Sequence, residues 1–337
     1  MKKRIVFYDV LRVIAIFAVI MIHVSAENWY VTKIDNNWLM NNFMNTLVGV
    51  WAVPLFVTIS GALLLGNKKI NFKNLIKKYI PRILICLFFW HLVYYFYTTP
   101  EFTISNLVIC LKKFLIGDSY SHLWYLYLTI GLYLLTPVLN KLVENLEKKE
   151  FIYLLVLGFF ITSIIPTLNY FLDFDLLRFI YPFKVLNFNI FIFYYLLGYY
   201  LNKFGFKKNK LLLIISLILL FGLSIFETIL SIIKNTPISY CSTSNIIGLL
   251  IVISVFSYFK ETFENKENKF ITTLGSLTFG VYLMHFLIEK ILLNFGINSN
   301  MMNPILGNIV ISFVILFISY IISYIISKIP ILRKLIL

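Results

Sequence analysis

Charged side chains are scarce in this chain of 337 residues: Asp, Glu, Lys and Arg make up 13% of it, and acidic residues number only 15. An average soluble domain carries about 25% charged residues. Hydrophobic residues make up 60% of the chain and aromatic residues 18%. A water-soluble fold could not bury so much apolar surface, so the composition excludes a soluble protein.

Cysteine is also rare. Cys86, Cys110 and Cys241 are odd in number, widely spaced and in apolar surroundings. They predict neither a disulfide framework nor a metal site. The chain also lacks a polar stretch long enough for a soluble domain. We therefore expect a single membrane-embedded domain over residues 1–337, with any chemistry inside or at the edges of a helix bundle.

Long apolar runs recur almost from end to end, and about 20 such residues span a bilayer. Ten runs predict an all-α polytopic transmembrane helix bundle with both termini in the cytoplasm. The predicted spans are 5–25, 44–66, 80–98, 122–140, 151–170, 188–202, 211–229, 241–259, 271–293 and 304–327. The run 188–202 is short and Pro166 interrupts 151–170, so nine or eleven spans also fit. Lys112 and Lys113 favour a helix at the membrane interface over 103–116.

The basic residues support this topology, because Lys and Arg of short loops stay mainly on the cytoplasmic side. With ten spans, the inner segments hold 22 Lys or Arg and the outer loops hold 7. The net charge of +15 is therefore explained by insertion into a membrane. We expect the lipid bilayer, and no nucleic acid, as a partner, in a multi-pass protein of the cell (plasma) membrane.

The first predicted span carries three ionisable residues: Asp9, Arg12 and His23. Eleven steps of about 100° place Arg12 and His23 on one helix face, about 16 Å apart along the axis. Asp9 falls on the same face and can pair with Arg12. Ionisable residues inside a span usually face the bundle interior and mark a functional site. The alternative is an anchor at the inner interface and a hydrogen-bonded histidine at the outer one.

Four stretches in separate spans carry a resemblance. They are Asp9–Arg12 with His23 after ten further residues, Val53–Gly61, His122–Leu126 and Phe279–His285. In this order they resemble the membrane acyltransferase-3 family, whose signature is a basic residue, ten spacers and a histidine. The length, the number of predicted helices and the stretch 28–32 after the histidine together make the chain most similar to the branch of enterobacterial common antigen O-acetyltransferases.

The resemblance implies a membrane O-acyltransferase. Such an enzyme moves an acyl group, in most cases acetyl, from cytoplasmic acyl-CoA to a hydroxyl of a cell-surface or lipid-linked glycan. Acetyl-CoA or another acyl-CoA would be a co-substrate, with no bound cofactor and no metal. His23 would be the general base or would itself be acylated. Arg12 would bind a donor phosphate or stabilise charge on the thioester oxygen, and Asp9 would hold Arg12 in place.

The donor site departs from the family pattern. Family members typically have two arginines three residues apart at the start of the third span. Here Arg82 matches the second position and Tyr79 occupies the first, while the neighbouring Lys78 could substitute. We therefore expect Arg82 and Lys78 to bind the acyl-CoA.

Four further residues are expected to bind substrate. His122 and Trp124 open the fourth span on the outer side, where an aromatic ring can pack on a sugar, although Trp124 could equally be an interfacial anchor. Tyr282 and His285 lie one turn apart on the ninth span and are expected to line the cavity.

Other candidates have structural interpretations. Ser60 and Gly61 are interpreted as helix-packing residues, and His91 as a structural histidine. The competing function is a polytopic transporter or flippase of a glycan or small solute. Internal repeats would favour it. Their apparent absence and the scarcity of buried acidic residues favour transfer chemistry.

Overall fold

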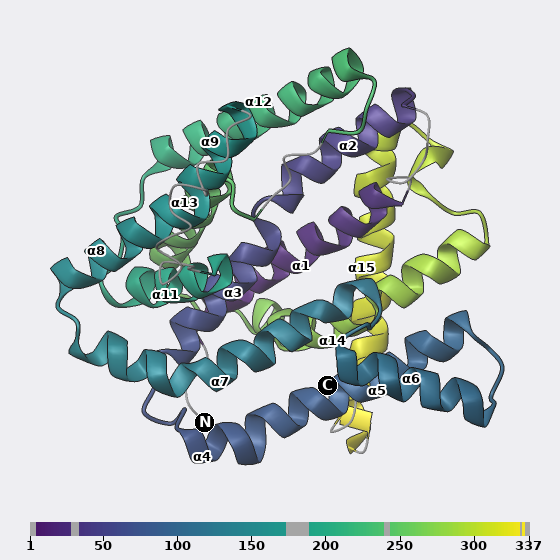
Figure 1. Ribbon diagram of the computed structural model, residues 1–337, viewed down its shortest axis with the longest axis horizontal. Helices are drawn as coiled ribbons and strands as arrows, with labels where there is room; N and C mark the ends of the chain where they lie inside the picture. Colours follow the sequence, from purple (N-terminus) through teal and green to yellow (C-terminus); the bar gives the residue numbers. More distant parts are fainter. Residues whose placement is uncertain (1–4, 28–33, 173–188, 239–242, 331, 334–337) are drawn as a thin grey trace.

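The computed structural model describes residues 5–27, 34–172, 189–238, 243–330 and 332–333 (Figure 1). Several sequence expectations fall on residues outside these ranges, among them the stretch 28–32 and Cys241. Within the described ranges the chain is helical, with no strand. The all-α fold predicted from the sequence is therefore confirmed.

The first half of the chain contains α1 (Val6–Ala26), α2 (Asn36–Gly49), α3 (Ala52–Leu64), α4 (Phe72–Asn74), the π-helical turn η1 (Leu75–Tyr79), α5 (Ile80–Thr98), α6 (Ile104–Ile116), the 3-10 turn η2 (Ser121–Leu123) and α7 (Trp124–Asn145). The second half contains α8 (Lys148–Phe159), the π-helical turn η3 (Phe160–Ile164), α9 (Ile165–Leu172), α11 (Ile190–Lys203), α12 (Lys210–Lys234), α13 (Ile246–Phe263), α14 (Lys269–Asn294), the 3-10 turn η5 (Ser299–Met301) and α15 (Pro304–Lys328).

Nine helical stretches within the described ranges are long and apolar enough to cross a membrane. They match nine of the ten predicted spans, including the span interrupted by Pro166, where the π turn η3 precedes the proline. A proline removes one backbone donor and crowds the preceding turn, and local π geometry accommodates this. The chain is therefore a multi-pass membrane protein.

The predicted span 188–202 corresponds to α11, which has 14 residues and a length of about 21 Å. That is shorter than the bilayer core of about 30 Å. Residues 173–188, which precede it, lie outside the described ranges. The tenth crossing stays a prediction.

Helix α11 is held deep in the bundle by its contact with α3. A Cβ atom on Gly61 of α3 would overlap the carbonyl oxygen of Tyr195, and one on Gly198 of α11 would overlap that of Thr58. The two backbones therefore touch directly, as small residues allow in membranes. This is the packing role expected for Gly61.

The histidine-bearing helix α1 lies in the middle of the bundle. It packs against α2, α3, α13, α14 and α15 (Figure 1). Its contact with α14 is close at Gly275, where a Cβ atom would meet the Asp9 side chain at 2.4 Å. The Asp9 side chain on α1 is thus enclosed by other helices.

Reporter fusions test both the orientation and the tenth crossing. A fusion at Asn71, between α3 and α4, should report a cytoplasmic location, and one at Asn37 an exported location, because the basic residues cluster on the inner side. A fusion at Lys208, between α11 and α12, should also be cytoplasmic if α11 and the residues before it cross the membrane. An exported reading at Lys208 would remove the tenth span, and one at Asn71 would reverse the orientation.

Candidate functional site

Three histidines from distant parts of the chain converge at one place. His23 comes from the last turns of α1, His122 from η2 and His285 from the middle of α14. The ring centroid of His285 lies 5.2 Å from that of His23 and 5.2 Å from that of His122, and the rings of His23 and His122 are 6.2 Å apart. We call these residues the histidine cluster. The sequence motifs predicted each histidine separately, and the fold brings them together.

A hydrogen bond shows which ring nitrogen of His285 carries the proton. His285 Nδ1 lies 2.6 Å from the carbonyl oxygen of Tyr282. A carbonyl can only accept, so Nδ1 carries the proton and Nε2 has a free lone pair. His285 Nε2 is buried and has no hydrogen-bond partner among the described residues, and the same holds for both ring nitrogens of His122. Buried polar atoms are rarely left in this state, and such groups occur at catalytic sites.

Tyr282 holds two members of the cluster in register. Its hydroxyl donates to the carbonyl oxygen of His122, while its own carbonyl accepts from His285. Tyr282 therefore links η2 to α14. Tyr282 lies beside His285, as expected, and its two hydrogen bonds hold His122 and His285 in position.

Aromatic rings enclose the cluster. Phe286 stacks on His122 with centroids 5.3 Å apart and meets His23 edge-on at 4.8 Å. Tyr94 of α5 meets His122 edge-on at 4.8 Å. The Tyr94 hydroxyl donates to the carbonyl of Leu283 and accepts from the amide of Leu287. It therefore contacts both backbone groups of one i, i+4 pair in α14. These contacts fix α14 at the turn that carries the histidine.

The outer end of α1 is also held by hydrogen bonds. The buried Asn45 of α2 donates to the carbonyl of Ile22 at 3.0 Å and to the hydroxyl of Ser25 at 2.9 Å. Carbonyls in the last turn of a helix lack intrahelical partners, so a side-chain donor stabilises that turn. His23 follows directly on Ile22 and is thereby positioned.

Acidic groups are buried close to the cluster. Glu289 follows His285 by one turn, is 3% exposed and has an Oε2 atom with no partner within the described ranges. Glu27, just beyond α1, is partly buried, and this burial raises its pKa while Lys290 opposes the shift. Glu227 of α12 is fully buried too and accepts from Thr46. The expected scarcity of buried acids is therefore wrong, since Glu227 and Glu289 are buried inside apolar helices.

The predicted ion pair of α1 is present farther from the outer end. Arg12 Nη1 lies 3.0 Å from Asp9 Oδ1. Asp9 is fully buried and Arg12 is 27% exposed. Gly275 makes room for the carboxylate because any side chain there would collide with it. The arginine is thus oriented by a buried partner.

Polar side chains connect this ion pair to the histidine cluster. Tyr133 of α7 lies near enough to Arg82 and Arg12 for their charges to act on its hydroxyl, and Tyr125 lies near enough to Arg12. Tyr125 lies two turns before Tyr133 on the same face of α7, and its ring is 5.7 Å from that of Tyr282. A row of arginines and tyrosines therefore runs from the start of α5 to the cluster.

Two predicted residues lie apart from this row. Lys78 is exposed on the π turn η1, with its ammonium 5.9 Å from the centre of the Tyr79 ring. Trp124 is 43% exposed and lies against Phe191 of α11, with centroids 5.5 Å apart. Its surroundings fit the anchor interpretation that the sequence left open.

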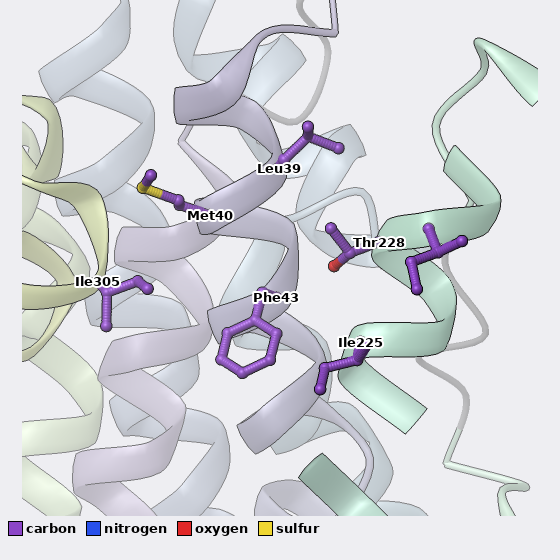
Figure 2. A pocket seen from close by; sticks show the side chains of 7 residues that line it. Leu39, Met40, Phe43, Ile225, Thr228 and Ile305 are labelled. Atoms are coloured by element: carbon purple, nitrogen blue, oxygen red, sulfur yellow. The ribbon is translucent and has the colours of Figure 1, made fainter. Parts of the chain in front are cut away.

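Two cavities adjoin the bundle. The first, of ≈ 230 Å³, lies among α2, α12 and α15, and Figure 2 shows its apolar wall with Thr228 as the polar side chain. Such a wall suits a lipid chain and offers no acid or base. The second, of ≈ 310 Å³, lies beside the cluster and is described below. In the described part of the chain, no group of three His, Cys, Asp or Glu is spaced to hold a metal ion.

Sequence reasoning missed the residues that surround the histidines. Glu289 could have been found, since it lies four residues after His285 on the same helix face. Tyr94 and Phe286 carry no such signal, because aromatic residues are common throughout these helices. Their place depends on how α5 and α14 cross.

Comparison with known proteins identifies the family. The profile of the acyltransferase-3 family, described as an acyltransferase domain, matches residues 5–328. An amino-acid racemase of Enterococcus faecalis is 30% identical over 183 residues, which cover 50% of this chain and 25% of that protein. The match thus spans about a quarter of the relative's length. No solved structure matches. The extent of the family match shows that this membrane protein belongs to the acyltransferase-3 family.

Proposed function

We propose that the protein is an O-acyltransferase of the cell membrane that moves an acyl group, in the first instance acetyl, from cytoplasmic acyl-CoA to a hydroxyl of a surface or lipid-linked glycan. The observation that carries this proposal is the histidine cluster, whose free ring nitrogens lie at one end of a row of arginines and tyrosines. A buried neutral imidazole is suited to proton transfer near neutral pH.

The cluster supplies the base that the transfer requires. A ring nitrogen of His23 takes the proton of the acceptor hydroxyl, whose oxygen attacks the thioester carbonyl. The carbon–sulfur bond breaks, and the thiolate of coenzyme A leaves and takes up the proton. The second route is attack by His23 itself, which gives an acyl-imidazole that the acceptor then cleaves. His285 and His122 are placed to hold or pass on the proton in either route.

The arginines at the other end suit the donor. Coenzyme A carries phosphates, which guanidinium groups bind strongly. Arg12 is held by Asp9 in a fixed orientation, and Arg82 lies at the start of α5. With the inner side of the membrane at Ile5, Arg12 lies about 10 Å deep and His23 about 27 Å deep. The thioester arm would bridge the two depths.

The two basic residues of the donor segment should differ in effect. Arg82→Ala should weaken acetyl-CoA binding by about 10–100-fold, since a charge-assisted hydrogen bond contributes about 1.5–3 kcal/mol. Lys78→Ala should change it by less than about twofold: both side chains are exposed, but only Arg82 lies near Tyr133, and a solvated lysine contributes little. Equilibrium binding of labelled acetyl-CoA to the purified variants measures both. Equal and negligible effects would move the donor site elsewhere.

The proposed glycan acceptor is supported by less specific features than the donor is. The cluster lies at the end of α1 that the charge distribution assigns to the outer face, where glycans are met. The branch of enterobacterial common antigen O-acetyltransferases remains part of the proposal through the sequence stretch 28–32.

Reconstitution tests the proposed function. The purified protein in vesicles, without any ion gradient, should consume acetyl-CoA and place ester-linked acetyl on glycan added to the outer side. Comparison of the surface glycan from cells with and without the gene, by mass spectrometry, identifies the acyl group and the acceptor. Transport of an intact glycan without any acyl transfer would contradict the proposal.

A further inference from the structure

The second cavity lies between the C-terminal halves of α5 and α6 and the loop after α6, and has a volume of ≈ 310 Å³. The charge distribution assigns this end of α5 to the outer side of the membrane. Unlike the apolar cavity of Figure 2, it is lined by polar and aromatic side chains. They are His91, Tyr95, Thr98, Lys113, Asp118, Ser119, Tyr120 and Ser121. We call this cavity the outer pocket.

A hydrogen-bond network forms its wall. His91 Nε2 lies 2.9 Å from the carbonyl oxygen of Cys110, and Nδ1 lies 2.8 Å from Ser119 Oγ. The carbonyl requires the proton on Nε2, so neutral His91 can only accept at Nδ1. The single Ser119 proton is shared between His91 Nδ1 and the Tyr127 hydroxyl. The proton of the Tyr127 hydroxyl itself goes to the carbonyl of Phe114. The Tyr127 hydroxyl lies 2.9 Å from Ser119 Oγ. Ser119 thus has a fixed position and keeps acceptor capacity for a group in the pocket.

The loop that carries Ser119 is shaped by the end of α6. Gly117 has a φ of 78°, and the amide of Asp118 donates to the carbonyl of Lys113 at 2.9 Å. This is a glycine-terminated helix cap, which needs the left-handed conformation. The Lys113 ammonium and the Asp118 carboxylate lie 3.4 Å apart, with both side chains about half exposed. The rim therefore carries no unbalanced charge.

Tyr120 forms the wall between the pocket and the histidine cluster. It lines the pocket, and its ring lies 6.2 Å from that of His122 and 5.2 Å from that of Phe286. It also stacks on Tyr94 at 4.7 Å. One aromatic ring, that of Tyr120, thus separates a molecule in the outer pocket from His122, and His23 lies beyond His122 and Phe286.

We propose that the outer pocket binds a sugar ring of the acceptor glycan and so directs one of its hydroxyls toward the histidine cluster. This inference rests on the proposed function and names a binding site for its acceptor. Neutral sugars suit a pocket that combines tyrosine faces with hydroxyl and imidazole groups, because rings pack on the former and hydroxyls bond to the latter. A balanced Lys113–Asp118 rim disfavours an anionic ligand, whose charge would meet Asp118. The volume is at the lower end for ligand pockets and fits a single ring unit.

The site can be blocked after the protein has folded. In cells carrying Ser119→Cys, the membrane-impermeant reagent 2-sulfonatoethyl methanethiosulfonate should reach the new thiol from outside and fill the pocket. Ester-linked acyl groups on surface glycan made after the treatment should then fall by about tenfold or more, since several polar contacts are lost together. The affinity of the purified, modified protein for acetyl-CoA should stay within about twofold.

Two controls isolate the pocket. Ser105→Cys lies on the exposed part of α6 outside the pocket, and the treated variant should acylate normally. In a Cys241→Ser background, the treated protein without an added cysteine should also keep its activity, because Cys86 and Cys110 are buried. Unchanged acylation in treated Ser119→Cys cells would overturn the inference, as would a parallel loss of acetyl-CoA affinity. Cells with the untreated wild-type protein that acylate no more than His23→Ala cells would instead refute the proposed function and this inference with it.

Discussion

Replacement of His23 by alanine should lower the rate of acyl transfer by about 10²–10⁴-fold, the usual contribution of a positioned base. The protein should still insert and fold, because His23 is only partly buried by its neighbours and α1 keeps its contacts with five other helices. Initial rates of acetyl transfer from acetyl-CoA by the purified protein measure the effect, and thermal unfolding shows that the fold is retained.

A neighbouring position supplies the matched control. Ile22→Ala removes an apolar side chain from the same turn of α1 and leaves the backbone carbonyl that Asn45 binds. It should lower stability slightly and activity by less than about threefold. If His23→Ala kept substantial activity, both the general-base route and the acyl-imidazole route would fail, and the anchor interpretation of His23 would replace them.

The two routes differ in what remains on the enzyme. Without an acceptor, an acyl-imidazole route leaves labelled acetyl on the wild-type protein and none on His23→Ala. A general-base route leaves none on either. Ping-pong kinetics would accompany the first route.

The sequence predicted the helices well because a bilayer limits the backbone to few solutions. Each span must satisfy its backbone hydrogen bonds internally, so apolar runs of sufficient length can be located from composition. The uncertain span, 188–202, is also the one whose helix α11 is too short for a simple crossing. Helix α11 is buried against α3 because the two backbones touch at Gly61 and Gly198. A hydropathy pattern cannot predict such a contact between two helices.

The candidate site was predicted in its parts but not in its assembly. Helical periodicity placed Asp9 next to Arg12, and their ion pair is present in the structure. Periodicity within one helix could not show that His122 lies against His285, since this depends on how η2 meets α14. The outer pocket was missed for a similar reason: His91 gave no pattern by itself, and Ser119 gains its position from the turn at Gly117.

Replacement of Arg12 by alanine should impair the enzyme in a different way from His23→Ala. The loss of a guanidinium that binds a donor phosphate should raise the KM for acetyl-CoA by about 10–100-fold, from the 1.5–3 kcal/mol of a charge-assisted hydrogen bond. Equilibrium binding of acetyl-CoA should weaken by a similar factor. His23→Ala, in contrast, should leave donor binding almost unchanged.

Stability must be separated from binding in this variant, because Asp9 is fully buried and loses its ion pair with Arg12. The cost should be about 1–3 kcal/mol, less than for a fully buried pair since Arg12 is 27% exposed. The double variant Asp9→Asn with Arg12→Gln removes both charges and should recover most of the thermal stability. It should not recover acetyl-CoA affinity, because the Arg12 guanidinium is still missing from the donor site. If the double variant bound acetyl-CoA like the wild type, Arg12 would be a structural residue. If Arg12→Ala lowered kcat alone, the arginine would act on the charge that develops at the thioester oxygen and not on the bound donor.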